Sequence, residues 1–140
     1  MKKLLTICLL LATTFTAKAQ NMSFEETVKY INEKLACCLD NKDVRLTAKK
    51  DGTVSFWGNT FNFFDLEDFT LSNYEKKLTL KTSNGIKVYL DESSGYYGTM
   101  FNTSSWSKLL FRDEINAERV YNALLHLRSL CTKTKDPFDK

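Results

Sequence analysis

The chain has 140 residues, of which 43% are hydrophobic and 26% are charged, and its formal net charge is +3. These values are typical of one globular domain and exclude a collagen-like, coiled-coil or disordered chain. One proline and five glycines cannot supply a flexible linker, so we expect no second folded domain.

The first 19 residues predict a secretory signal peptide. Lys2 and Lys3 precede a short apolar run at residues 4–12, and Ala17-Lys18-Ala19 forms a small-x-small cleavage site. The apolar run is too short and wrongly flanked to span a bilayer. We therefore expect a secreted or periplasmic protein, with one domain at residues 20–140 and no membrane attachment after cleavage.

The positive charge of the whole chain belongs to this leader. Removal of Lys2, Lys3 and Lys18 lowers the basic residues from 20 to 17, which equals the 17 acidic residues. The remaining cations are scattered among acids, whereas a nucleic-acid binder needs clustered cations that displace counterions. The sequence argues against a nucleic-acid partner.

Two amphipathic helices are predicted, one at each end of the mature chain. The first begins at Ser23, which fits a capping box with Glu26, and its apolar stripe comprises Phe24, Val28, Ile31, Leu35 and Cys38. The second runs from Asp113 or Asn116 to about Cys131. Its stripe comprises Val120, Leu124, Leu127 and Cys131, widened by Ala117 and Tyr121.

Between the helices, residues 44–111 alternate with period two and predict about six or seven short antiparallel strands. Asp51-Gly52 and Asn84-Gly85 indicate hairpin turns. We prefer three-residue loops with both glycines left-handed, because a one-residue slip would turn every side chain to the other face. The preferred loops give the pairs Leu46–Phe56, Ala48–Val54, Leu80–Val88 and Leu78–Leu90.

Three further strands are expected in this region. Phe61 to Leu71 is aromatic-rich, and its phase breaks near Asp65 to Asp68, which suggests a bulge or bend. Tyr96 to Asn102 and Ser107 to Phe111 complete the set.

The order of these elements resembles a known superfold. The closing helix ERVYNALLHLRSL follows a strand meander, and over Val44 to Cys131 this order is similar to the pleckstrin-homology-like superfold. The resemblance implies an α+β fold, in which a strongly bent antiparallel sheet or partly open barrel is capped by the C-terminal helix. The additional first helix departs from that pattern, and an α+β sheet with two helices on one face is the alternative.

The chain also resembles a group of small secreted Bacteroidota proteins of unassigned function. The resemblance lies in the signal layout, the opening SFEETVKYINEKL helix and the ending ALLHLRSLCTKTKDPF.

Three cysteines remain after Cys8 leaves with the signal peptide, in a compartment where disulfides persist. Cys38 and Cys131 each end the apolar stripe of a helix, which predicts a disulfide between them, with Cys37 as the alternative partner of Cys131. Three buried thiols are the other possibility. Adjacent Cys37-Cys38 lacks zinc-knuckle spacing, so we expect no metal and no cofactor.

The sequence offers little for catalysis. His126 is the only histidine, falls off the main stripe of its helix, and is not joined by a Gly-x-Ser-x-Gly motif. Asp65, Glu67 and Asp68 could form a carboxylate pair or a calcium site, but such a run more often marks the solvated face of a strand. We expect no enzymatic activity and no catalytic residue.

A basic first hairpin binds phosphoinositides in pleckstrin-homology domains, and Lys49 and Lys50 precede the first predicted turn. Asp51 at the tip and the absence of cations on the following strand argue against this lipid function.

Aromatic residues suggest a binding surface. Trp57, Tyr96 and Tyr97 break the strand alternation beside glycines. With Trp106 they predict an exported, non-enzymatic module that binds a protein or peptide partner through a sheet edge or an aromatic patch. The alternatives are a carrier with a dry Phe- and Leu-lined cavity, and a hydrolase that uses His126.

Overall fold

The computed structural model describes residues 21–40, 43–67, 77–103 and 107–135. The predicted signal peptide and Trp106 lie outside these ranges. The helices are α2 (Phe24–Cys38) and α3 (Glu114–Ser129), and η1 (Phe63–Asp65) is a short 3-10 helix. The described residues between the helices form seven strands: β1 (Leu46–Ala48), β2 (Thr53–Phe56), β3 (Asn59–Asn62), β4 (Lys77–Ser83), β5 (Ile86–Asp91), β6 (Tyr96–Phe101) and β7 (Ser107–Phe111).

The strands form two antiparallel sheets, β1-β2-β3 and β4-β5-β6-β7. The prediction of an α+β fold with about seven antiparallel strands is confirmed. We expected one continuous bent sheet or a partly open barrel, whereas the described strands divide into two sheets and no pairing among them closes a barrel. Within the same ranges, no helix is both long and apolar enough to cross a membrane.

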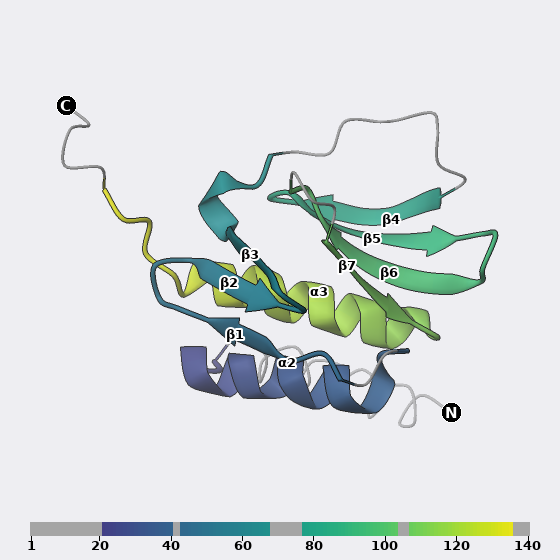
Figure 1. The fold of residues 1–140 in the computed structure, drawn as a ribbon, viewed down its shortest axis with the longest axis horizontal. Coiled ribbons are helices and arrows are strands. Elements are labelled where there is room, and N and C mark those ends of the chain that lie inside the picture. Colours follow the sequence, from purple (N-terminus) through teal and green to yellow (C-terminus); the bar gives the residue numbers. More distant parts are fainter. Residues whose placement is uncertain (1–20, 41–42, 68–76, 104–106, 136–140) are drawn as a thin grey trace, which may run out of the picture.

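Helix α3 lies at the centre of the fold, between the four-stranded sheet and α2 (Figure 1). Its side chains Val120, Leu124 and Leu127 are fully buried, as the predicted stripe requires. The helix begins at Asp113, whose carboxylate accepts a 2.8 Å hydrogen bond from the backbone N–H of Asn116.

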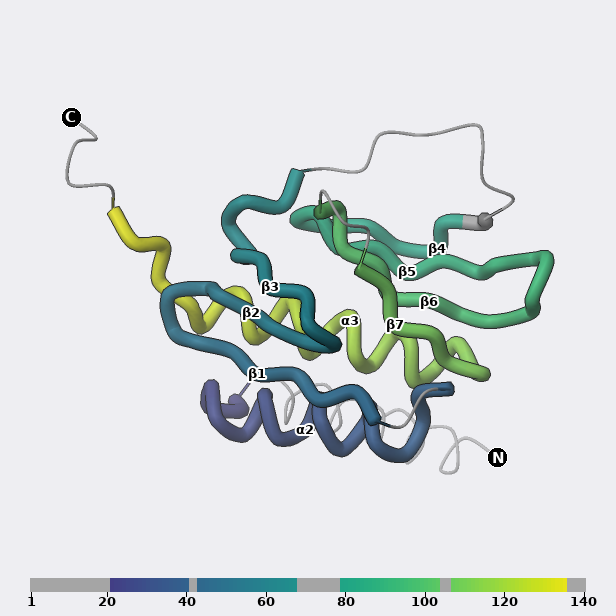
Figure 2. The backbone as a smooth tube through the Cα atoms, viewed as in Figure 1, coloured from purple at the N-terminus to yellow at the C-terminus, as the bar shows by residue number. Residues whose placement is uncertain are grey.

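Helix α2 covers the other side of α3 and runs antiparallel to it (Figure 2). The predicted capping box is present. The Ser23 N–H donates to the Glu26 carboxylate at 2.8 Å, and the Glu26 N–H donates to the Ser23 hydroxyl at 3.2 Å. The Ser23 backbone N–H, which stabilises the charged form, lowers the pKa of Glu26.

The first hairpin has the predicted register. Leu46 lies opposite Phe56 and Ala48 lies opposite Val54. A 2.8 Å bond from the Lys49 N–H to the Thr53 carbonyl closes a three-residue loop, in which Gly52 has φ +91°. The left-handed conformation that this loop demands explains the glycine.

The prediction for the second hairpin is wrong at its turn. Ser83 lies opposite Ile86, so the loop has two residues, Asn84 and Gly85, with φ of 50° and 71°. A register shift between Thr79 and Lys81 leaves Leu80 as a bulge. The bulge absorbs the one-residue difference, and the predicted Leu78–Leu90 pair therefore still forms.

Aromatic rings join the two sheets inside the core. The ring centroid of Phe101 lies 5.3 Å from that of Phe56 and 4.8 Å from that of Phe61. These distances lie in the range of favourable aromatic pairs. The hairpin β2–β3 is thereby held against the end of β6.

The central position of α3 predicts that truncation of a leucine within this helix and truncation of the leucine that caps its end have very different effects on the free energy of unfolding. Leu124→Ala should lower the free energy of unfolding by about 2–5 kcal/mol, because Leu124 is fully buried and truncation leaves a cavity. Leu130→Ala is the control, since this side chain at the end of the helix is 37% exposed, and we expect less than about 1 kcal/mol. Urea unfolding measures both, and equal losses would contradict the central placement of α3.

Candidate functional site

The outer edge of β1 is covered by a side chain of α2. The Asn32 amide donates to the Leu46 carbonyl at 2.8 Å, and its oxygen accepts from the Leu46 N–H at 2.8 Å. Asn32 therefore occupies the place of a neighbouring strand at this edge.

The outer edge of β7 is covered by the chain that leaves α2. The Asp40 N–H donates to the Leu110 carbonyl at 3.0 Å, and Leu39 forms a bridge with Phe111. The Asp40 carboxylate also lies 3.3 Å from the Arg112 guanidinium, which holds this cover in place.

The edge strand β4 carries two features that discourage further strand pairing. The bulge at Leu80 interrupts its regular ladder, and Lys81 places a charge on the strand. The Lys81 ammonium lies 3.0 Å from the Glu118 carboxylate on α3. Bulges and lysines are common protection of edge strands.

The outer edge of β3 has none of these covers among the described residues. The Phe63 N–H donates to the Gly52 carbonyl at 2.9 Å. Along an antiparallel pair of strands, every second residue forms its backbone hydrogen bonds with the partner strand. The backbone N–H and C=O groups of Thr60 and Asn62 therefore point away from β2. No described backbone group pairs with them. The strand Asn59–Asn62 contains no charged residue, proline or bulge, so it is open to pairing with another strand.

Trp57 stands at the start of this open edge, in the turn between β2 and β3. Because Phe56 pairs with Asn59, the turn contains only Trp57 and Gly58, with φ of 51° and 76°. The Trp57 side chain is 62% exposed. A bulky aromatic residue at positive φ is a backbone outlier, and such outliers cluster at functional sites.

A hollow of about 500 Å³ lies at the other end of the same edge. Its described lining comes from the end of β3, from the segment after η1 and from the residues after β6: Phe61, Asn62, Asp65, Leu66, Glu67, Asn102 and Thr103. The carrier hypothesis requires a dry cavity lined by Phe and Leu, whereas most of these residues are polar.

The walls of the hollow are fixed by hydrogen bonds and close packing. The Asn62 side chain donates to the Asp51 carbonyl at 3.0 Å and accepts from the Phe64 N–H at 2.9 Å. The Asn102 amide donates to the Glu67 carbonyl at 3.1 Å. The Cα of Gly85 lies so close to Leu66 that a Cβ built on it would overlap that side chain.

The other predicted aromatic site residues lie elsewhere. Tyr96 and Tyr97 begin β6 and are half-buried. The Tyr96 hydroxyl points to the Asp40 carboxylate at 3.5 Å, while Tyr97 packs against the core. No ring contact within the described ranges joins either tyrosine to Trp57. Trp106 lies outside the described residues.

The residues considered for catalysis do not meet among the described ones. The Nε2 atom of His126 lies 2.9 Å from the Met22 carbonyl oxygen, and His126 does not line the hollow that holds Asp65 and Glu67. No group of three or more metal-binding side chains occurs in the described part of the chain.

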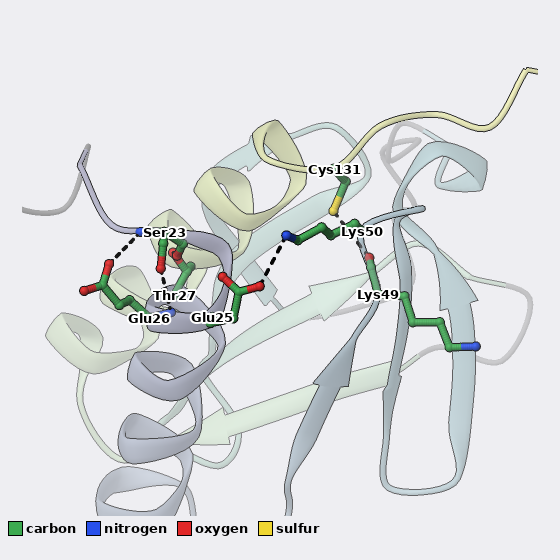
Figure 3. A network of polar contacts seen from close by, with 7 residues as sticks. All are labelled: Ser23, Glu25, Glu26, Thr27, Lys49, Lys50 and Cys131. Atoms are coloured by element: carbon green, nitrogen blue, oxygen red, sulfur yellow. Dashed lines mark hydrogen bonds and ion pairs between the residues drawn. The ribbon is translucent and has the colours of Figure 1, made fainter.

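Lys50 of the first hairpin contacts the start of α2, and the backbone of Lys49 contacts Cys131, two residues after the end of α3 (Figure 3). The Lys50 ammonium lies 3.3 Å from the Glu25 carboxylate and 5.8 Å from the centre of the Phe24 ring. The Lys49 carbonyl accepts a 3.7 Å contact from the thiol of Cys131. Burial raises the pKa of this thiol, so the neutral form is favoured.

The predicted disulfide between Cys38 and Cys131 is not present in the structure. Cys37 is bonded to Cys38, and Cys131 is a free thiol. The reason is the antiparallel packing of the helices. Cys38 ends α2 on the side where α3 starts, whereas Cys131 follows the last turn of α3 on the side where α2 starts. The two apolar stripes share a core but end at opposite sides of it.

Sequence reasoning did not identify β3 as an open edge. Trp57 was interpreted as a break in a strand, although glycine at the second position of a two-residue turn is a hairpin signal. Comparison with known proteins finds no match to a family model, to a curated protein or to a solved structure.

A pair of glycine variants tests the packing that forms the hollow. Gly85 and Gly95 have φ of 71° and 72°, so Ala costs about 1–2 kcal/mol of backbone strain at either position. Only at Gly85 does the new Cβ collide with Leu66, whereas nothing lies within 4 Å at Gly95. We expect Gly85→Ala to destabilise the protein by about 1–3 kcal/mol more than Gly95→Ala in urea unfolding. Equal losses would show that segment 66–67 does not pack on this turn.

Thiol counting tests the cysteine assignment. A protein of residues 20–140 should react with one equivalent of maleimide before reduction and with three after reduction and unfolding. The single thiol should react slowly near neutral pH and faster as the pH rises, because burial raises the pKa of Cys131. The variant Cys131→Ser should show no reaction before reduction, and intact mass reads out each count. A reactive thiol that survives in this variant would contradict the Cys37–Cys38 bond.

Proposed function

We propose that this protein is an exported, non-enzymatic module that binds an extended segment of a protein or peptide partner along the open edge of β3. The supporting observation is the difference among the sheet edges. Asn32 covers β1, Asp40 covers β7, and β4 is bulged, while Thr60 and Asn62 leave their backbone groups unpaired within the described ranges. Strand addition is the recognition mode that uses such an edge.

The backbone of β3 supplies the hydrogen bonds for this mode. Thr60 and Asn62 each offer one N–H and one C=O, so a partner strand gains up to four bonds, each contributing about 0.5–1.5 kcal/mol. Thr60 is exposed, so the partner can reach the edge without opening the core. Four bonds alone give weak binding, and side-chain contacts must supply the remainder.

Trp57 supplies the side-chain anchor. Tryptophan is enriched among the residues that dominate binding energy, and this one is 62% exposed at the start of the edge. The backbone of Trp57 is already ordered in the two-residue turn, and its indole has only two side-chain torsions, so little conformational entropy is lost when the ring becomes buried.

In this proposal the two helices support the sheets from behind and do not contact the partner strand. A sheet backed by a buried C-terminal helix is also the arrangement of the pleckstrin-homology-like superfold, to which we propose the chain is related. Export through the predicted signal peptide would place the open edge in the periplasm or outside the cell, where peptide partners are accessible.

One substitution separates binding from folding. Trp57→Asn gives this turn the Asn-Gly pair found at Asn84-Gly85, where φ is nearly the same. We expect the variant to be more stable by about 0.5–1 kcal/mol, because Asn tolerates the left-handed conformation, and to lose at least about tenfold in affinity. Urea unfolding and titration with peptides selected from a random twelve-residue display library measure the two effects.

The matched control is Ile115→Asn, which removes an apolar side chain that is also 62% exposed but lies on α3. Its peptide affinity should equal that of the wild type. Selected peptides that bind Trp57→Asn as tightly as the wild type, or a library that yields no binding peptide, would contradict the proposed function.

A further inference from the structure

The hollow at the end of β3 extends the proposed edge site, and its chemistry indicates what the partner carries. Phe61 and Asn62 belong both to the edge strand and to the lining of the hollow. A strand that adds to β3 therefore runs toward this space, and a side chain at its end can enter it. This inference rests on the proposed function and adds the chemical class of one partner residue.

Asp65 and Glu67 line the hollow with exposed carboxylates that make no hydrogen bond or ion pair within the described ranges. Most other described acids have such a partner. Glu25 pairs with Lys50, Glu33 with Lys29, Glu118 with Lys81 and Asp40 with Arg112, while Glu26, Asp51, Asp91 and Asp113 cap turns or helices. Glu92 and Glu114 are likewise exposed without such a partner, but among the described residues only Asp65 and Glu67 place unpaired carboxylates in the lining of the hollow.

No cation of the described lining offsets these charges. Arg128 lies nearby in the fold, with its guanidinium 5.2 Å from the centre of the Phe64 ring, but it forms no ion pair with either carboxylate. Calcium takes about six to eight oxygen ligands, and no group of three or more metal-binding side chains occurs among the described residues. The unmatched charge therefore favours an organic cation.

The remaining lining suits a long basic side chain. Phe61 and Leu66 offer apolar surface for a methylene stem, while Asp65 and Glu67 offer acceptors for its charged end. A lysine or arginine combines these two parts, and a hollow of about 500 Å³ is large enough to hold either side chain. A free metal ion or a purely apolar residue would use only part of the surface.

We propose that the segment bound along β3 places a lysine or arginine side chain in the hollow, between Asp65 and Glu67. The occupant is an extended peptide with a basic residue next to its strand-forming part. Charge complementarity also directs the approach of the peptide, so binding should weaken as the salt concentration rises.

Synthetic peptides of one design test this proposal. Acetylated and amidated heptapeptides of alternating threonine and valine carry lysine, glutamine or glutamate at the second or the sixth position. We expect the tighter-binding lysine peptide to bind about tenfold more tightly than its glutamine counterpart and the glutamate peptide to bind most weakly. Backbone amide shifts of Thr60 and Asn62 in nuclear magnetic resonance titrations report binding at two salt concentrations.

Two double variants assign the preference to the hollow. Asp65→Asn with Glu67→Gln should bind the lysine and glutamine peptides equally. The control, Glu92→Gln with Glu114→Gln, removes the same charge from exposed acids outside the hollow and should retain the lysine preference. All four positions are exposed, so we expect these variants to fold like the wild type.

The outcomes separate the two proposals. All peptides could bind at Thr60 and Asn62 with equal affinity and lose that binding in Trp57→Asn. This result would overturn the inference that the partner carries a basic residue, but it would support the edge site. A lysine preference that persists in the Asp65 and Glu67 variant would also overturn this inference. No shift at the β3 amides with any peptide would overturn both the inference and the proposed function.

Discussion

The packing of α3 between the four-stranded sheet and α2 is the constraint on which the rest of the structure depends. The helix needs apolar side chains on more than one side, and Ala117, Val120, Tyr121, Leu124 and Leu127 provide them. Helix α2 covers the face of α3 that the four-stranded sheet leaves free, and the two helices are antiparallel. The end of α2 therefore lies beside the start of α3, where Asp40 pairs with the edge of β7. The same packing brings Asn32 to the edge of β1. The helices thus cover two sheet edges as a consequence of covering the core.

This arrangement explains why one edge is left open. Both covers come from α2, which runs along β1 and ends at β7 and cannot also reach β3 on the far side of the small sheet. The aromatic contacts of Phe56 and Phe61 with Phe101 hold the small sheet against the large one through side chains rather than backbone bonds. The split between the sheets therefore leaves both the β3 backbone and the neighbouring hollow uncovered by the residues that the structure describes.

The sequence predicted features that depend on local chemistry. The Ser23 capping box, the Asp113 cap, the three-residue loop at Gly52 and the Ser107–Phe111 strand each follow from a few adjacent residues. The bulge at Leu80 was not predicted. Asn84-Gly85 fits a two-residue turn well, but in a regular ladder that turn would set Leu78 and Leu80 on the face opposite Val88, so the sequence favoured a longer loop. The cysteine pairing and the covers of β1 and β7 depend on helix orientation, which the apolar stripes do not define. The candidate site could be predicted only in part. Trp57 belongs to both the predicted and the proposed site, but the open edge of β3 can be identified only after the covers of the other sheet edges are known.

The backbone conformation at Trp57 is one that tryptophan rarely adopts. Asn84 occupies the same backbone conformation in the other two-residue turn, with φ of 50° against 51° for Trp57, and Asn is a residue that tolerates it. Tryptophan at this position costs about 1–3 kcal/mol of strain and exposes a large apolar ring. Burial of that ring by a partner would contribute about 2–4 kcal/mol, which is enough to offset the strain. In the isolated chain neither cost is recovered, since the ring is 62% exposed and makes no ring contact among the described residues. The proposed contact with another molecule would account for both the conformation and the exposure of Trp57, which the packing of the described residues alone does not.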